Sequence, residues 1–131
     1  MNPLTLDMPM QMTKLRILIV EDDDDARVAL ERLLSRHGYT AVSASNADSA
    51  LARAKEHNPD IAICDWMLPG DRDGVEVARA IQRQYRSAVI FVTAYPVAEL
   101  HKRSLDIQVN AYLSKPLNPQ QLLAEVNRAR P

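Results

Sequence analysis

The sequence contains few of the residues on which specialised protein classes depend. Only one of its 131 residues is cysteine and only three are glycine. The lone cysteine, Cys64, excludes an intramolecular disulfide and is typical of a reducing compartment, so we expect a cytoplasmic protein. Basic and acidic side chains nearly balance at 16 and 17, and the formal net charge of -1 argues against a nucleic-acid or membrane-surface binder. No apolar run approaches the ~20 residues that a membrane span requires.

What the chain does contain is the ordinary composition of one globular domain. Apolar residues make up 47% and charged residues 25%, which excludes a collagen-like or fully disordered chain. Residues 1–13 contain three internal methionines and two prolines, without the pattern of a secretory signal. We therefore expect a flexible N-terminal leader over residues 1–13 and a single domain over residues 14–131.

Short β-branched apolar runs alternate with helical apolar stripes from residue 15 onward. The runs predict strands buried on both faces, at residues 15–20, 40–43, 61–64, 88–92 and 111–114. The segments after them predict five helices, the first with an inward stripe of Val28, Leu30, Leu33 and Leu34. This alternation predicts an α/β fold, in which a doubly wound, five-stranded parallel sheet has the flavodoxin-like order 2-1-3-4-5 and helices on both faces.

Polar residues stand directly after four of the expected strands. The carboxyl ends of parallel strands meet at one edge of the sheet, and folds of this type bind ligands beside the first and third strands. Residues that are far apart in the sequence are thereby expected to share one site. Its expected members are Glu21, Asp22, Asp65, Thr93 and Lys115.

The acidic members of this site predict a bound metal ion. Two carboxylates ~4 Å apart repel each other by about 4 kcal/mol at an effective dielectric of ~20, so a cation between them is stabilising. Hard oxygen ligands suit Mg²⁺, for which Glu21, Asp22 and Asp65 are the candidates. The alternative is a solvated acidic turn, which is our interpretation of residues 23–25, with Asp23 as a helix cap.

Asp65 is the candidate nucleophile. A carboxylate can attack a phosphoryl group and form an acyl phosphate when cations neutralise the phosphoryl oxygens. Lys115 is the expected second cation, and a cis bond to Pro116 would direct its ammonium inward. Thr93 is the expected hydroxyl ligand of the phosphoryl group. The structural alternatives are a cap or turn at Asp65, a turn at Thr93 and a solvated lysine at position 115.

Four motifs of this sequence resemble those of the receiver domains of bacterial two-component response regulators, including chemotaxis response regulators. They are Ile-Leu-Ile-Val-Glu-Asp-Asp, Cys-Asp-Trp-Met-Leu-Pro-Gly, Phe-Val-Thr-Ala and Tyr-Leu-Ser-Lys-Pro-Leu. The similarity runs over about residues 14–130 with the motifs in the family's order. It implies that Asp65 is the phosphoacceptor, and that Mg²⁺ is bound by Asp22, Asp65 and the backbone carbonyl of Met67, with Glu21 acting through water.

The resemblance also implies roles for three further residues. Thr93 and Lys115 would contact the phosphoryl group. Tyr112 matches the aromatic switch position, which turns inward as Thr93 moves toward a phosphoryl oxygen. The structural alternative for Tyr112 is a half-buried strand tyrosine with no switching role.

The chain departs from the usual family pattern near the expected site. The loop between Pro69 and Gly74 is one residue longer, which we expect to change the backbone near the metal. Met67 and Tyr95 are bulky residues at positions that influence the lifetime of the phosphoryl group in this family. We expect both to crowd the attacking water and to lengthen that lifetime.

The resemblance implies a phosphorylation-switched signalling domain rather than a metabolic enzyme. A sensor histidine kinase or a histidine phosphotransfer protein would donate the phosphoryl group to Asp65, and the domain would catalyse its own phosphorylation and slow dephosphorylation. The added charge would switch a surface that contacts a downstream protein or a missing output domain, and a homodimer is left open. Neither nucleic acid nor membrane is an expected direct partner of this domain.

Three other functions are compatible with part of this pattern. A pseudo-receiver would bind partners without phosphate turnover, although all five site residues are present. A Mg²⁺-dependent phosphatase of the haloacid dehalogenase type has a second aspartate two residues after its nucleophile, where this chain has Met67. A flavin carrier of the same fold has a phosphate loop rich in glycine and hydroxyls, whereas the acidic residues 21–25 would repel a phosphate.

Overall fold

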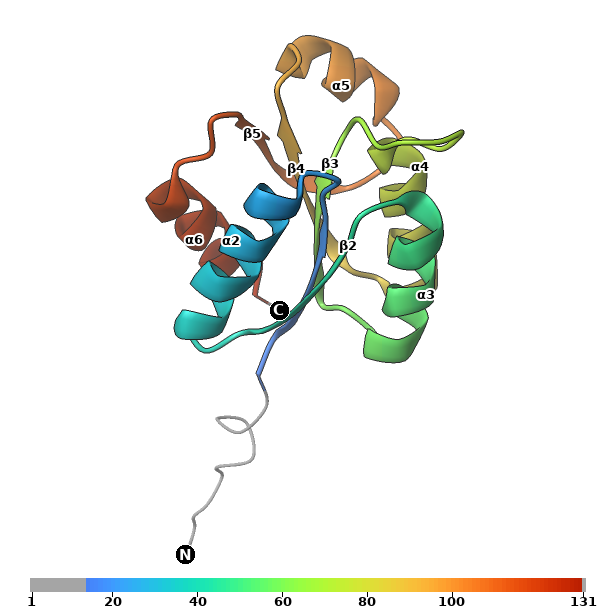
Figure 1. The fold of residues 1–131 in the computed structure, drawn as a ribbon. Coiled ribbons are helices and arrows are strands. Elements are labelled where there is room, and N and C mark those ends of the chain that lie inside the picture. The colour runs from blue at the N-terminus through green and yellow to red at the C-terminus, as the bar shows by residue number, and fades with distance from the viewer. Residues whose placement is uncertain (1–13, 131) are drawn as a thin grey trace, which may run out of the picture.

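A five-stranded parallel sheet lies at the centre of the fold (Figure 1). The computed structural model describes residues 14–130, and the leader predicted at residues 1–13 lies outside the described residues. The strands are β1 (Arg16–Val20), β2 (Thr40–Ala44), β3 (Ile61–Asp65), β4 (Ala88–Thr93) and β5 (Val109–Ser114). They pair in parallel in the order β2-β1-β3-β4-β5, which confirms the predicted fold class and strand order.

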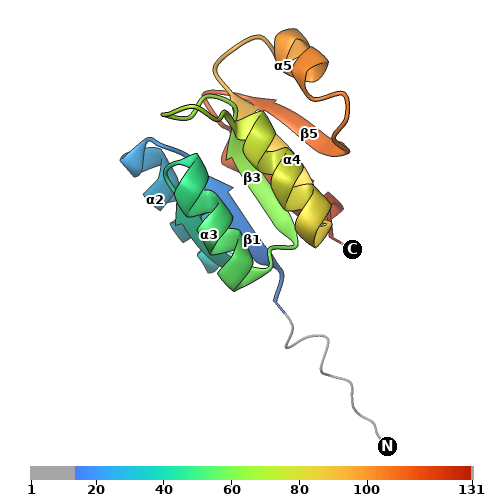
Figure 2. The same cartoon turned by 90° about the vertical axis from the view of Figure 1, so that its right-hand side faces the viewer.

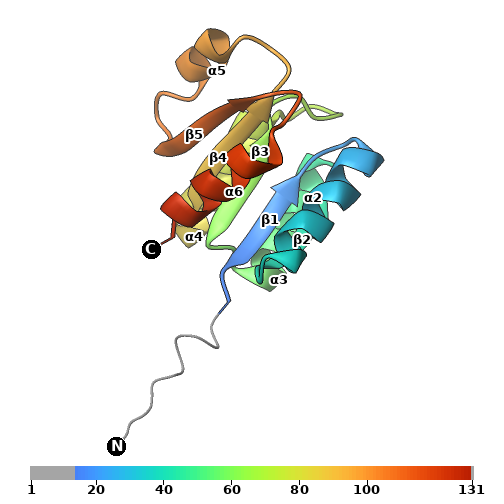
Figure 3. The same cartoon turned by 90° about the vertical axis from the view of Figure 1, so that its left-hand side faces the viewer.

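Helices cover both faces of this sheet. On one face lie α2 (Asp24–Arg36) and α6 (Pro119–Arg128), as Figure 3 shows. On the other lie α3 (Ala47–His57) and α4 (Gly74–Tyr85), together with the shorter α5 (Val97–Arg103) near the carboxyl ends of the strands (Figure 2). Among residues 14–130, no helix has the length and apolar composition that crossing a membrane requires.

Each face of the sheet has its own apolar core, because successive strand residues point to opposite faces. In β1, Ile17 and Ile19 belong to the core under α2 and α6, whereas Leu18 and Val20 belong to the core under α3 and α4. All four residues are at most 1% exposed. Burial on both faces explains why this strand is a continuous apolar run rather than an alternating one.

The helix cap predicted at Asp23 is confirmed, but one predicted core residue is wrong. The side chains of Asp23, Asn46 and Asn118 each accept a hydrogen bond from a backbone amide of the helix that follows. Val28, expected in the buried stripe of α2, is 40% exposed, and Leu34 is the residue of that helix that is fully buried. Six positions separate the two residues, which places them about 120° apart around a helix of 3.6 residues per turn.

The carboxyl ends of the strands form the upper edge of the sheet in Figure 1. The segments that leave β1, β3, β4 and β5 at this edge carry all the residues of the predicted site. The fold therefore places residues from four separate parts of the chain on one side of the molecule.

Candidate functional site

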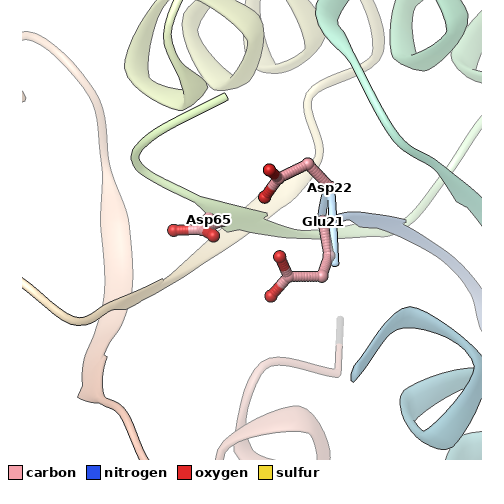
Figure 4. Close-up of side chains that lie close together, drawn as sticks. All are labelled: Glu21, Asp22 and Asp65. Atoms are coloured by element: carbon pink, nitrogen blue, oxygen red, sulfur yellow. The ribbon is translucent and has the colours of Figure 1, made fainter. Parts of the chain in front are cut away.

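Three carboxylates converge at the ends of the neighbouring strands β1 and β3 (Figure 4). Glu21 and Asp22 follow β1 directly, and Asp65 is the last residue of β3. One carboxylate oxygen from each residue lies within 4.8 Å of the other two. Glu21 and Asp65 are 4% and 8% exposed, whereas Asp22 is open to solvent. The fold thus brings the three predicted acidic residues into one cluster with a buried side and a solvent side.

Lys115 supplies a positive charge to this cluster. Its Nζ lies 2.8 Å from a carboxylate oxygen of Glu21 and 2.8 Å from a carboxylate oxygen of Asp65. The bond between Lys115 and Pro116 is cis. Partial burial lowers the pKa of Lys115, but the hydrogen bonds and charges of Asp65 and Glu21 outweigh this effect and hold the pKa above its ordinary value. The ammonium is therefore charged throughout the physiological range.

Both carboxylate oxygens of Glu21 have partners within the protein. Oε1 accepts from Lys115, while Oε2 accepts from the backbone amide of Asp23 at 3.1 Å. The backbone carbonyl of Glu21 also accepts from a guanidinium nitrogen of Arg27 at 3.1 Å. These contacts hold the Glu21 carboxylate in one orientation, with its charge directed at Lys115.

The charges and ligand types of the cluster fit Mg²⁺. The three carboxylates carry a formal charge of -3 and the Lys115 ammonium +1, so the cluster has a formal charge of -2. Mg²⁺ is bound in proteins by one or two carboxylates and retains several waters, which the exposed side at Asp22 allows. The donor set that these residues offer is therefore the one that this ion prefers.

Thr93 ends β4 at the same edge and is fully buried. Its hydroxyl oxygen accepts a hydrogen bond from the backbone amide of Tyr95 at 2.9 Å. Its backbone carbonyl accepts from the amide of Lys115 at 2.8 Å. Because the backbones of β4 and β5 are bonded here, Thr93 and Lys115 occupy adjacent places at the sheet edge.

Tyr112 lies in β5 and is half-buried against the core under α3, α4 and α5. Its ring stacks on Phe91, with centroids 6.0 Å apart and an interplanar angle of 24°. Its hydroxyl lies 2.7 Å from the hydroxyl of Ser104, which itself donates to the carbonyl of Leu100 at 2.7 Å. Ser104 has one proton to give, so Tyr112 is the donor in their contact. The ring is therefore held by Phe91 and Ser104 in this structure, and its switching role stays a prediction.

Gly74 supports the end of β3, where Asp65 lies, in a way that sequence reasoning missed. A Cβ atom at this position would lie 1.7 Å from the backbone carbonyl oxygen of Asp65, so the first turn of α4 packs directly on the end of β3. The amide of Gly74 also donates to the carbonyl of Trp66 at 2.6 Å. The available signal was the capping box Asp73-Gly-Val-Glu76, which places a helix start at this glycine.

Cys64 lies immediately behind the cluster and is fully buried. Burial, followed by the negative charge of the neighbouring Asp65, raises the pKa of the Cys64 thiol to about 12. A thiol in this environment stays protonated and is a poor nucleophile. We therefore assign Cys64 to the core rather than to the chemistry of the site.

An apolar groove of about 650 Å³ opens beside Lys115, between α2 and the segment that leads from β5 into α6. Its lining consists of Glu21, Asp23, Ala26, Ala29, Leu30, Leu33, Arg36, Val92, Lys115, Pro116, Leu117 and Pro119. Four apolar residues of α2, Ala26, Ala29, Leu30 and Leu33, contribute to this groove. Glu21 and Lys115 belong both to the groove and to the acidic cluster.

The family model described as response regulator receiver domain matches residues 17–127. The chain belongs to this family. The match includes every residue of the acidic cluster together with Lys115 and Thr93, and it confirms the resemblance seen in the sequence motifs.

Two relatives illustrate the proteins in which this domain type occurs. The cyclic di-GMP phosphodiesterase of Thermotoga maritima is 35% identical over 114 residues, which cover 86% of this chain and 30% of that protein. The phosphate regulon transcriptional regulatory protein PhoB of Escherichia coli is 32% identical over 114 residues, which cover 85% of this chain and 49% of that protein. The receiver domain thus spans half or less of the length of these relatives.

Solved structures of receiver domains have the same fold. A CheY-like receiver domain protein from Methanospirillum hungatei is 31% identical with a TM-score of 0.82, covering 88% of this chain and 93% of that one. The receiver domain of a modulated diguanylate cyclase from Desulfovibrio desulfuricans is also 31% identical, with a TM-score of 0.81 and coverage of 89% and 94%. The Vibrio cholerae chemotaxis protein CheY4 is 26% identical with a TM-score of 0.83, covering 90% and 100%.

Proposed function

We propose that this receiver domain accepts a phosphoryl group on Asp65 and acts as a phosphorylation-dependent switch in a two-component system. The observation that carries the proposal is the position of Lys115 Nζ, 2.8 Å from both Asp65 and Glu21. This arrangement sets a permanent cation beside the acceptor carboxylate, within a cluster of residues that fits Mg²⁺. Membership of the receiver domain family supports the same conclusion.

In the proposed reaction, Asp65 is the nucleophile. A carboxylate oxygen forms a bond to the phosphorus of a phosphohistidine, and the phosphorus–nitrogen bond breaks as its electron pair returns to the imidazole of the donor. The Lys115 ammonium neutralises charge on the phosphoryl oxygens. The hydroxyl oxygen of Thr93 already accepts from the Tyr95 amide, so its own proton is the one that can be donated to a phosphoryl oxygen.

We propose that Asp22, Asp65 and the backbone carbonyl of Met67 hold Mg²⁺, with Glu21 acting through water. When bound, the ion supplies positive charge that a phosphoryl group needs as it approaches a carboxylate. Lys115 reduces the repulsion between the buried Glu21 and Asp65, which keeps both available at the end of the sheet. Asp22 is exposed, so it can bind or release an ion without rearrangement of the core.

The phosphoryl donor that we propose is a sensor histidine kinase or a histidine phosphotransfer protein. The groove of about 650 Å³ supplies apolar surface directly beside Lys115, where such a protein would approach Asp65. Leu30 and Leu33 of α2 line this groove and are only half-buried, so a protein partner can bury them further. Contact at this place would bring the donor histidine to the open side of the acidic cluster.

We propose that the switch is read by a downstream protein or by an output domain, and that residues 14–131 form the receiver domain. The two relatives described above are named as a phosphodiesterase and a transcriptional regulator, and a comparable output for this protein is part of the proposal.

The domain acts in the cytoplasm on protein partners, with a homodimer as one form of the switched state. It is a phosphoacceptor with slow self-catalysed dephosphorylation, and neither nucleic acid nor membrane contacts it directly.

The test is phosphorylation of the purified chain by a small acyl phosphate, followed by intact-mass measurement. The expected result is the addition of one phosphoryl group in the presence of Mg²⁺, no addition when EDTA is present from the start, and no addition to the Asp65→Asn variant. Equal labelling of wild type and variant would overturn the assignment of Asp65. Absence of labelling in the wild type, with binding of partners retained, would identify a pseudo-receiver instead.

A further inference from the structure

One carboxylate oxygen connects the loop after the phosphoacceptor to the end of α5. The indole Nε1 of Trp66 donates to Asp73 Oδ2 at 3.2 Å. A guanidinium nitrogen of Arg103 lies 3.2 Å from the same oxygen. Trp66 directly follows Asp65, and Arg103 is the last residue of α5. Asp73 Oδ2 therefore connects Trp66, in the loop after β3, with Arg103 at the end of α5.

The same contacts bind α5 to the first turn of α4. Asp73 and Glu76 form the capping box of α4, in which each side chain accepts from the backbone amide of the other residue. Arg103 also lies 3.7 Å from the Glu76 carboxylate. The guanidinium therefore contacts both acidic members of the cap, and Gly74 of the same turn packs on the carbonyl of Asp65.

Trp66 also contacts the segment that precedes α5. The ring of Tyr95, two residues before this helix, meets the Trp66 ring edge-on with centroids 6.0 Å apart and an interplanar angle of 78°. The backbone amide of Tyr95 donates to the hydroxyl of Thr93. Trp66 therefore contacts Tyr95, just before α5, directly. It is connected to Arg103, at the end of α5, through the Asp73 carboxylate.

The helix itself has little to hold it in place. It contains seven residues, Leu100 is the one that is fully buried, and its N-cap residue Pro96 makes no side-chain capping bond. Isolated helices of this length are unstable in water, so the contacts at the two ends determine where the helix lies. Figures 1 and 2 show α5 standing at the edge of the molecule, above the sheet and close to the β3–α4 loop.

We propose that Trp66, Asp73 and Arg103 form a latch that holds α5 in its unphosphorylated position. The inference rests on the proposed function, since it concerns how phosphorylation of Asp65 reaches the surface. Arg103 is a positioning residue that acts through Asp73 and Trp66. A contact that exists in one conformation and lengthens in the other shifts the equilibrium between them by the free energy of that contact. The latch therefore opposes the switched conformation until a phosphoryl group is present.

The size of the effect follows from the exposure of the ion pair. The Arg103 and Asp73 side chains are 40% and 23% exposed. Ion pairs of this kind carry modest free energies, so opening the latch is expected to change the conformational equilibrium by about two- to fivefold. Its loss should make a phosphoryl analogue bind more tightly by the same factor, because less of the binding free energy is used to move α5.

The experiment measures the binding of beryllofluoride, a phosphoryl analogue, to the full chain at saturating Mg²⁺ by calorimetry. Arg103→Gln and Asp73→Asn are expected to lower the Kd about two- to fivefold. Arg103→Lys retains the charge and is expected to restore most of the wild-type value. The matched control is Arg128→Gln, because Arg128 contacts Glu125 at 2.9 Å within α6 and lies outside the latch.

A second readout separates a latch from a general loosening of the site. Trp66 is the chain's one tryptophan, so its emission reports on the indole bonded to Asp73. Without any ligand, the emission of Arg103→Gln is expected to move toward that of the beryllofluoride-bound wild type. General loosening would instead weaken beryllofluoride binding.

The outcomes distinguish the latch from the function on which it rests. If the wild type binds beryllofluoride and Arg103→Gln binds it equally or more weakly, the latch is overturned while the receiver function stands. If the wild type itself fails to bind the analogue and cannot be phosphorylated, the proposed function fails first.

Discussion

The α-carbon of Gly74 packs so closely on Asp65 that a methyl group at position 74 would lie 1.7 Å from the Asp65 carbonyl oxygen. The obstruction is backbone rather than a flexible side chain, so either the end of β3 or the first turn of α4 must move when a side chain is introduced. This contact makes the position of the proposed phosphoacceptor depend on a glycine that belongs to another element.

The first prediction concerns this contact. Gly74→Ala is expected to lower the free energy of unfolding by about 1–3 kcal/mol and to abolish or strongly slow phosphorylation, because overpacking displaces the backbone of Asp65. Chemical denaturation and acyl phosphate labelling measure the two effects. The control is Gly38→Ala, since Gly38 has a φ of +89° but nothing within 4 Å of its Cβ position. Gly38→Ala should lose stability and keep full labelling, and normal labelling of Gly74→Ala would contradict the prediction.

The second prediction concerns Lys115 and pH. The folded-state pKa of Lys115 is raised, so the stabilisation from its bonds to Glu21 and Asp65 is fully present below about pH 10 and is lost as the pH rises through that raised value. With EDTA present, Lys115→Met should be less stable than wild type at pH 8, by on the order of 1 kcal/mol. The difference should shrink as the pH rises through the raised pKa of Lys115.

Urea unfolding at several pH values provides the measurement for Lys115. The two proteins differ only at residue 115, so pH effects common to both cancel in the difference. A gap between wild type and variant that stays constant from pH 8 to the alkaline limit would show that the ammonium does not stabilise the acidic cluster.

The third prediction concerns the groove beside Lys115. Leu33→Asp places a charge in its apolar lining and should slow phosphoryl transfer from a protein donor at least about tenfold, because a buried unpaired charge weakens the complex. Labelling by a small acyl phosphate should be unchanged. Val28→Asp is the matched control, since Val28 lies on the same helix but is 40% exposed and outside the groove. Equal loss with both donors would mean that Leu33 supports the fold rather than the complex.

The fourth prediction concerns Cys64. Its thiol is fully buried, and its pKa is raised to about 12 by burial and by the charge of Asp65. At pH 8 a disulfide reagent should therefore label the native protein more than about 10³-fold more slowly than the protein in denaturant, because the thiolate fraction and access are both small. A native rate near that of a free thiol would show that the core behind Asp65 opens readily.

Much of the fold followed from local pattern. Continuous β-branched runs such as residues 17–20 predicted strands buried on both faces, and the carboxylates that end two of them predicted a shared acidic site at one sheet edge. Alternation of strands and helices restricts the topology strongly, because crossovers are right-handed and parallel strands end on the same side. The cap signal at Asp23 likewise predicted a helix start, since capping is a property of adjacent residues.

The error at Val28 has a physical cause that a sequence pattern does not contain. Val28 and Leu34 are both apolar residues of α2, but the sheet covers only a narrow stripe of that helix. Which apolar residues are buried depends on how the helix rotates against its neighbours: Leu30 and Leu33 line the groove, whereas Val28 is exposed outside it.

The sequence by itself determined the class of fold, the edge of the sheet where the chemistry lies and the acidic, cationic and hydroxyl residues gathered there, because these depend on periodicity and on the ends of strands. Only the tertiary structure decided that Lys115 bridges Glu21 and Asp65, that Gly74 touches Asp65, and that Arg103 reaches Trp66 through Asp73. Such contacts depend on side-chain direction and on the packing of α4 and α5 against the sheet, which are set by the whole fold rather than by neighbouring residues.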